Sequence, residues 1–172
     1  MTEAGDIIRG AETAGLKIVT AESCTAGLTA DLLASTPGAS RVLWGGFVCY
    51  TPEAKARMLG IEKSFLEKYG LVSRETAMAM AESALEQSGA DLAVSVTGLA
   101  GPDGDGSGVP VGTVWIGAAL RGGECEALAY FYTGSRQEIR RAAARESLNV
   151  LGRRLEFCLG KSRVNGINPE FF

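Results

Sequence analysis

The sequence of 172 residues contains no histidine. This absence excludes the Ser-His-Asp triad, the Cys-His pair and every metal site that depends on imidazole ligands. A hydrolase built from this chain needs another general base, and the candidates are lysine, tyrosine, glutamate and aspartate.

Several other features are missing. The four cysteines form no Cys-x-x-Cys pair, which argues against a zinc ribbon and favours reduced thiols in a cytoplasmic protein. No apolar run reaches membrane-spanning length and the N-terminus lacks a basic signal-peptide start, so we expect no membrane partner. The net charge of −3 gives no electrostatic footprint for nucleic acid, so none is expected as a partner either.

The 46% hydrophobic content is enough for one sizeable core, and we predict a single domain over 1–160 with a flexible tail over 161–172. Helix-like and strand-like segments alternate before a hairpin at 121–123 and a long helix opened by a capping box at Ser135. The order predicts an α/β fold: a three-layer α/β/α sandwich with a mixed, mostly parallel sheet and an antiparallel edge hairpin. Strand 41–50 should contain a bulge or a close backbone approach at its Gly-Gly pair.

Residues 20–27, TAESCTAG, join a predicted strand to a predicted helix. Unpaired N–H groups at such a helix start can bind an anion or a developing oxyanion. Ser23 is the candidate nucleophile, with Cys24 as a rival that is more commonly a small buried hydrophobe. Thr25 is most simply the cap of the helix, and Glu22 either orients a base or sits in the turn.

Lys55 is the best-placed base, because Thr51-Pro52-Glu53 begins a helix and puts Lys55 in or just beyond its first turn. A lysine base must be neutral, so its pKa has to fall from about 10.4 to roughly 7–8. The helix start contributes only about 0.3–1 kcal/mol toward this shift, and burial would have to supply the rest. The alternative is an ordinary exposed lysine.

Ser23, Tyr50 and Thr97 each lie at or just past a predicted strand end, where ligands bind in α/β folds. The glycine-rich stretch 97–110 follows the last of these strands. Its aspartates resemble the start of an EF-hand loop, but position twelve is Val114, so we expect no calcium. The stretch either offers backbone N–H groups to a phosphate or carbonyl oxygen, or is a flexible connector.

Three arginines cluster where the last helix begins. Arg136, Arg140 and Arg141 have the spacing to hold a phosphate between them. The alternative is a solvated charged face, which is the reading we favour for Arg145.

Taken in order, several of these segments resemble the CinA C-terminal domain family over about residues 5–158. The motifs that carry the resemblance are Ala21–Gly27, Gly46–Tyr50, Glu53–Lys55, Thr97–Gly104 and Pro110–Val114. Stand-alone, PncC-type members look like nicotinamide mononucleotide deamidases, which hydrolyse the carboxamide to nicotinate mononucleotide and ammonia.

In the mechanism we expect, amides near residues 24–27 stabilise the oxyanion, and no metal or cofactor is required. The resemblance implies that Ser23 is the nucleophile and Lys55 its base. It also implies a nucleotide substrate and a homodimer. The substrate-binding residues expected from it are Thr25, Tyr50, Thr97, Gly98, Gly101, Arg136 and Arg140.

Two departures from the family accompany this expectation. The chain has Gly134-Ser135-Arg136 where Gly-Asp-Arg is frequent, which weakens the assignment there. The molybdopterin-binding-like domain of longer CinA proteins has no counterpart in these residues, so none of its activities is expected. Two alternatives stay open: a non-catalytic nucleotide-binding or regulatory module, and an amidase for another small carboxamide.

Overall fold

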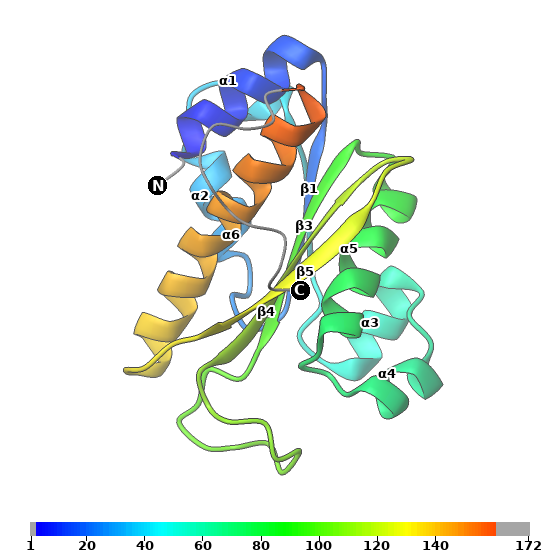
Figure 1. Cartoon of the computed structure of the whole chain (residues 1–172), viewed down its shortest axis with the longest axis vertical. Helices are drawn as coiled ribbons and strands as arrows, with labels where there is room; N and C mark the ends of the chain where they lie inside the picture. Colours follow the sequence, from blue (N-terminus) through cyan, green and yellow to red (C-terminus); the bar gives the residue numbers. More distant parts are fainter. Residues whose placement is uncertain (1–2, 161–172) are drawn as a thin grey trace.

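A computed structural model describes residues 3–160, and the expected flexible tail over 161–172 lies outside them. Helices and strands follow one another along the chain as in Figure 1. The elements, apart from one short 3-10 turn, are α1 (Ala4–Ala14), β1 (Ile18–Glu22), α2 (Leu28–Ala34), β2 (Leu43–Val48), α3 (Pro52–Leu59), α4 (Lys63–Tyr69), α5 (Arg74–Ser88), β3 (Leu92–Gly98), β4 (Thr113–Leu120), β5 (Cys125–Phe131) and α6 (Arg136–Cys158). Among the helices of residues 3–160, none has the length and apolar character to cross a membrane.

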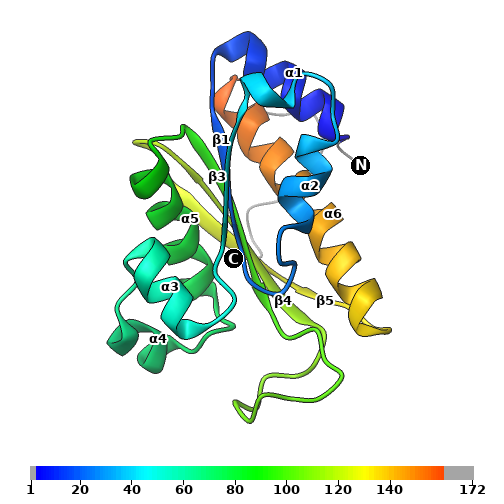
Figure 2. The same cartoon turned by 180° about the vertical axis from the view of Figure 1, so that it is seen from behind.

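The five strands form one sheet in the order β2-β1-β3-β4-β5. β1 pairs in parallel with β2 and β3, whereas β4 is antiparallel to both of its neighbours. Helices α1, α2 and α6 cover one face, and α3, α4 and α5 cover the other (Figures 1 and 2). The predicted three-layer sandwich with a mixed sheet is confirmed, and its antiparallel part includes the β3–β4 pair as well as the hairpin.

Two hydrophobic clusters hold the layers together, one on each face of the sheet. The interior strand β1 is buried along its whole length, as expected for a parallel strand covered on both sides. Its alternate side chains divide between the clusters: Ile18 packs toward α1 and α6, and Val19 packs toward α5. Residues at the end of β1 are therefore directed to opposite layers.

Edge strand β2 carries the irregularity expected at its Gly-Gly pair. Ile18 faces Leu43 but Val19 faces Gly45, so Trp44 is the extra residue of a bulge. Gly46 lies so close to β1 that a Cβ there would collide with the hydroxyl of Thr20. Both the bulge and the close approach are present.

The carboxyl ends of β1, β2 and β3 meet at one end of the sheet (Figure 2). The loop between β3 and β4 projects from this end, and α6 begins there. The predicted capping box is formed, since Ser135 and Glu138 exchange backbone and side-chain hydrogen bonds. The start of α6 is thereby fixed beside the three strand ends.

We predict that Gly117→Ala destabilises the protein by about 1–3 kcal/mol, because β4 packs directly on α5 at this point. A Cβ at Gly117 would lie 2.7 Å from the backbone oxygen of Ala77 and 2.6 Å from Ser95 Oγ. Chemical denaturation measures the change. Gly104→Ala is the control, since nothing lies within 4 Å of its Cβ position; equal effects of the two substitutions would contradict the packing argument.

Candidate active site

Ser23 and Lys55 meet in the interior at the end of β1. Ser23 follows the strand directly, and its N–H donates to Val96 O at 2.8 Å, which extends the ladder with β3. Lys55 lies on the first turns of α3, where the Thr51 hydroxyl caps the helix. Its Nζ is 3.0 Å from Ser23 Oγ and donates to Cys49 O at 2.9 Å. The side chains come from two different layers and form one buried contact.

Lys55 is not an exposed helix lysine, because only 1% of its surface is accessible. Burial lowers the pKa of Lys55 to about 8, against the weaker opposing influence of the thiols of Cys49 and Cys24. Within residues 3–160 no carboxylate forms an ion pair with it. At pH 7 about a tenth of the molecules therefore carry a neutral amine beside Ser23 Oγ.

Glu22 holds the start of α2. Its side chain is fully buried, and its carboxylate accepts hydrogen bonds from the amides of Gly27, Thr29 and Ala30 at 2.9–3.0 Å. The hydroxyl of Thr20 donates to the same carboxylate at 3.1 Å. A carboxylate at a helix N-terminus is favoured both by these donors and by the helix dipole. Of the two roles that the sequence left open for Glu22, the structure gives it neither: it is a buried helix cap.

The expectation that Thr25 caps α2 is wrong. The helix begins at Leu28, and its N-cap residue is Gly27, which has no side chain to accept a capping hydrogen bond. Ala26 and Gly27 have φ angles of 51° and 97°, which remove them from the helix and lengthen the turn. A left-handed alanine costs about 1–2 kcal/mol. Thr25 is fully buried, and its hydroxyl has no hydrogen-bond partner in the described part of the chain.

The turn after Ser23 leaves two adjacent amides free. The amide of Ala26 donates to Ser23 O, and that of Gly27 is taken by Glu22. The amides of Cys24 and Thr25 donate to no other residue within residues 3–160, and the amide of Cys24 lies against its own thiol. Backbone donors next to a nucleophile have the placement of an oxyanion hole. Of the amides over residues 24–27 considered from the sequence, these two are the ones available.

The thiol of Cys24 is a poor competitor for Ser23. It packs in the hydrophobic cluster under α1, α2 and α6, on the face of the sheet opposite Lys55. Burial raises its pKa to about 11. A thiol that is protonated at neutral pH and faces away from the base is not an activated nucleophile.

Beside the strand ends, Arg136 connects Tyr50 with Gly101. Arg136 donates to Gly101 O at 2.6 Å and to the hydroxyl of Tyr50. Both side chains are exposed, and they link the end of β2 to the glycine-rich loop and the start of α6. Gly101 has a φ of 75°, and a Cβ there would lie 2.7 Å from Val111 Cγ1. The structure brings these three expected residues together.

Thr97 and Gly98 lie in β3 beside the turn. The Ser23–Val96 bond puts Thr97 opposite Ser23 in the ladder, on the face toward α3 and α5. The Thr97 hydroxyl donates to Leu71 O at 2.7 Å. Gly98 permits the close approach of β4, because a Cβ there would lie 2.8 Å from Thr113 O. Contact of either residue with a substrate stays a prediction.

Arg140 binds the turn itself. Its Nε donates to Cys24 O at 2.8 Å, and its Nη2 donates to Thr25 O at 3.0 Å. The side chain is half-buried, unlike that of Arg136 one turn earlier on α6. Sequence reasoning missed these contacts, although the spacing of four residues does place both arginines on one face of the helix.

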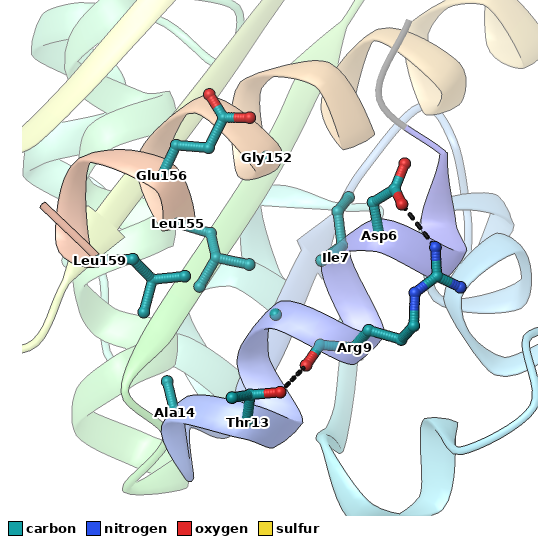
Figure 3. Close-up of a pocket in the computed structure, with 10 residues that line it drawn as sticks. Asp6, Ile7, Arg9, Thr13, Ala14, Gly152, Leu155, Glu156 and Leu159 are labelled. Atoms are coloured by element: carbon teal, nitrogen blue, oxygen red, sulfur yellow. Dashed lines mark hydrogen bonds and ion pairs between the residues drawn. The ribbon is translucent and has the colours of Figure 1, made fainter. Parts of the chain in front are cut away.

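A groove lies elsewhere, between α1 and the end of α6 (Figure 3). Its walls include Ile7, Gly10, Leu155 and Leu159, and it is at the end of the sheet opposite Ser23. None of the expected site residues lines it. Residues 3–160 contain no group of three or more side chains that could hold a metal ion; a reaction that needs no metal stays a prediction.

The chain is similar to known proteins in both sequence and fold. The profile of the CinA C-terminal domain matches residues 2–155. A CinA-like protein from Akkermansia muciniphila is 47% identical over 133 residues, which are 77% of this chain and 32% of that protein. The crystal structure of competence/damage inducible protein CihA from Agrobacterium tumefaciens is 40% identical with a TM-score of 0.81, covering 91% of this chain and 97% of that one. The crystal structure of a CinA superfamily protein from Escherichia coli is 30% identical in sequence with a TM-score of 0.84. It covers 88% of this chain and 87% of that one.

The chain belongs to the CinA C-terminal domain family. It spans about a third of the length of the curated relatives that it matches, 32% of the Akkermansia protein and 34% of a CinA-like protein from Geobacter sulfurreducens. By contrast, it covers nearly all of the solved CihA chain. The fold and the family are therefore established, and the reaction is argued from the site.

We predict that Lys55→Met makes the protein more stable at pH 7, by up to about 3 kcal/mol. With the folded pKa near 8, the unfolded chain binds a proton up to about pH 10.4 that the folded chain has released. Wild-type stability from this group therefore rises with pH between these values, and the cost of burial is complete below pH 8.

Denaturant unfolding of both proteins across this range measures the difference, which should shrink as the pH rises from 8. Lys63→Met, at an exposed position, is the control and should show no such trend. A Lys55→Met protein that is less stable than wild type at every pH would show that burial of Lys55 does not lower the free energy of unfolding.

Proposed function

We propose that the protein hydrolyses the carboxamide of nicotinamide mononucleotide, giving nicotinate mononucleotide and ammonia, in the recycling of pyridine nucleotides. The observation that carries this proposal is the buried contact between Lys55 Nζ and Ser23 Oγ at 3.0 Å, with the lysine pKa near 8. A hydroxyl nucleophile beside an amine that is neutral part of the time is the arrangement that acyl transfer needs when histidine is absent. The resemblance of the motifs to PncC-type deamidases supplies the substrate.

Acylation begins with neutral Lys55. Its Nζ accepts the Ser23 proton while Oγ attacks the carboxamide carbon, and the carbonyl oxygen gains the negative charge. The amides of Cys24 and Thr25 donate to this oxyanion. The C–N bond then breaks, the Lys55 ammonium gives its proton to the departing nitrogen, and ammonia leaves an ester on Ser23.

Deacylation repeats these roles with water. Lys55, neutral again, accepts a proton from water as the oxygen attacks the ester carbon. The second tetrahedral oxyanion uses the same two amides. Collapse breaks the bond to Ser23 Oγ, which takes the proton back from Lys55, and nicotinate mononucleotide is released. One water is consumed and the enzyme returns to its starting state.

The exposed guanidinium of Arg136, near the strand ends, is the group that we assign to the phosphate of the nucleotide. Arg136 presents a planar guanidinium fork beside Tyr50 and the glycine-rich loop, and such a fork matches phosphate geometry. Its present acceptors, Gly101 O and the Tyr50 hydroxyl, are neutral, so a dianionic phosphate competes for it favourably. Tyr50, half of whose surface is exposed, offers an aromatic face to the pyridine ring.

We predict that the purified protein releases ammonia from nicotinamide mononucleotide without added metal, and that Ser23→Ala lowers kcat at least about 10³-fold, because the nucleophile is lost. Coupled detection of ammonia and nicotinate mononucleotide measures both. Ser64→Ala, on the exposed face of α4, is the control and should keep wild-type activity.

Three outcomes separate the alternatives. Turnover that survives in Ser23→Ala contradicts the serine mechanism. Binding of the nucleotide without release of ammonia supports a non-catalytic regulatory module. Equal rates on a panel of small carboxamides that lack the phosphate support a general amidase with the same Ser23 chemistry.

We also predict that kcat/KM rises with pH and levels off above a midpoint near 8, because only neutral Lys55 can accept the Ser23 proton. Below the midpoint the rate should fall about tenfold per pH unit. Initial rates at limiting substrate from about pH 6 to about pH 9 give the profile of the free enzyme. A profile that is flat over this range, or activity kept by Lys55→Ala, rules out Lys55 as the base.

A further inference from the structure

We infer that Arg140 is a positioning residue that orients and polarises the oxyanion-binding turn, and that it does not bind the substrate phosphate. The inference rests on the proposed function, since polarised amides matter only if an oxyanion forms at Ser23. It differs from the role that the family resemblance implied for Arg140. It is carried by two backbone contacts, to Cys24 O and Thr25 O.

The two contacts fix successive peptide groups of the turn. Arg140 Nε lies 2.8 Å from Cys24 O, and Nη2 lies 3.0 Å from Thr25 O. A guanidinium is planar and rigid, so a fork that spans both carbonyls sets their relative orientation. Thr25 O receives one other bond, a long one of 3.3 Å from the amide of Leu28. Arg140 is the main restraint on the outer side of this turn.

The geometry of a trans peptide directs the free amide. The carbonyl of Cys24 and the N–H of Thr25 belong to the same planar group and point in opposite directions. Helix α6, which carries Arg140, and helix α3, which carries Lys55, lie on opposite faces of the sheet (Figure 2). With its carbonyl tied to Arg140, this peptide turns the Thr25 N–H away from α6 and toward the layer that contains Lys55.

The positive charge adds an electronic effect. A cation hydrogen-bonded to the carbonyl of Cys24 withdraws electron density from the amide of the same peptide and makes the Thr25 N–H a stronger donor. No similar help comes from α2, whose first amides are taken by the carboxylate of Glu22. The strength of the candidate oxyanion hole therefore depends on Arg140.

Arg136 provides a matched comparison on the same helix. It is exposed, and its contacts are with Gly101 and Tyr50, not with the turn. Substitution of Arg136 should weaken binding of a phosphate-bearing substrate and leave the reactivity of Ser23 unchanged. Substitution of Arg140 should lower the reactivity of Ser23 and leave the binding of a phosphate-bearing substrate unchanged.

The test measures covalent modification of Ser23 by an alkyl fluorophosphonate, which has no ribose or phosphate ester of a nucleotide. Ser23 Oγ attacks phosphorus, fluoride leaves, Lys55 accepts the proton, and the phosphoryl oxygen occupies the oxyanion position. Intact-mass spectrometry gives the rate. We expect Arg140→Gln to slow labelling about 10–100-fold, somewhat less than the loss of an oxyanion donor itself, and Arg136→Gln to change it by less than about twofold.

Turnover of nicotinamide mononucleotide gives an independent readout. Arg140→Gln should lower kcat with little change in KM, whereas Arg136→Gln should raise KM with little change in kcat. Added guanidinium ion at non-denaturing concentration should restore part of the labelling rate of Arg140→Ala, which a loss of folded protein would not allow. Circular dichroism of each variant reports the folded fraction.

Several results overturn the inference. The first is labelling of Arg140→Gln at the wild-type rate, and the second is a decrease in the labelling rate that only follows the folded fraction. The third is an effect confined to the KM for the nucleotide, which would make Arg140 a phosphate ligand. If wild type reacts with the probe but releases no ammonia, the proposed substrate fails and labelling still decides the role of Arg140. Wild type that is inert to the probe at Ser23 overturns both proposals.

Discussion

The buried carboxylate of Glu22 is the interaction on which the site depends. It lies at the end of the interior strand β1 and accepts hydrogen bonds from three amides at the start of α2 and from the hydroxyl of Thr20. Breaking such a set leaves several buried donors unpaired, each at a cost of about 1–3 kcal/mol. Because the Glu22 side chain joins the end of β1 to the start of α2, the two ends of the turn between them are held in place. The conformation of residues 23–27, including the left-handed Ala26, follows from that joint.

The second constraint is the dry environment of Lys55. Its amine has neutral acceptors, Ser23 Oγ and Cys49 O, and no carboxylate of residues 3–160 forms an ion pair with it. An ion pair would make the lysine more stable in its charged form and useless as a base, because an opposite charge raises a lysine pKa. Stability is given up at this position in exchange for a titration near neutral pH, which is a common relation between stability and activity.

Much of the fold could be predicted from the sequence, because local signals are written in single segments. Pro52 after Thr51, the capping box at Ser135 and the glycine pair in β2 each specify structure through their neighbours in the chain. The Ser23–Lys55 pair could be proposed because histidine is absent. The cap of α2 could not: Thr25 has the better local pattern, and Glu22 prevails only because two left-handed residues extend the turn. The contacts of Arg140 join residues 116 and 115 positions apart and depend on how α6 packs over that turn.

The two faces of the sheet divide the work of the proposed reaction. The α3 side supplies the group that moves protons, and the α6 side supplies the charge that orders and polarises the backbone. Ser23 lies between them at the strand end, so the proposed chemistry uses backbone amides and a lysine that do not depend on the identity of the leaving molecule. Tyr50 and Arg136, to which we assign contact with the substrate, belong to separate elements: Tyr50 follows β2, and Arg136 begins α6. In the proposed reaction, substitution of Tyr50 or Arg136 would change which carboxamide is bound without disturbing the nucleophile, so substrate choice and reactivity would be separable.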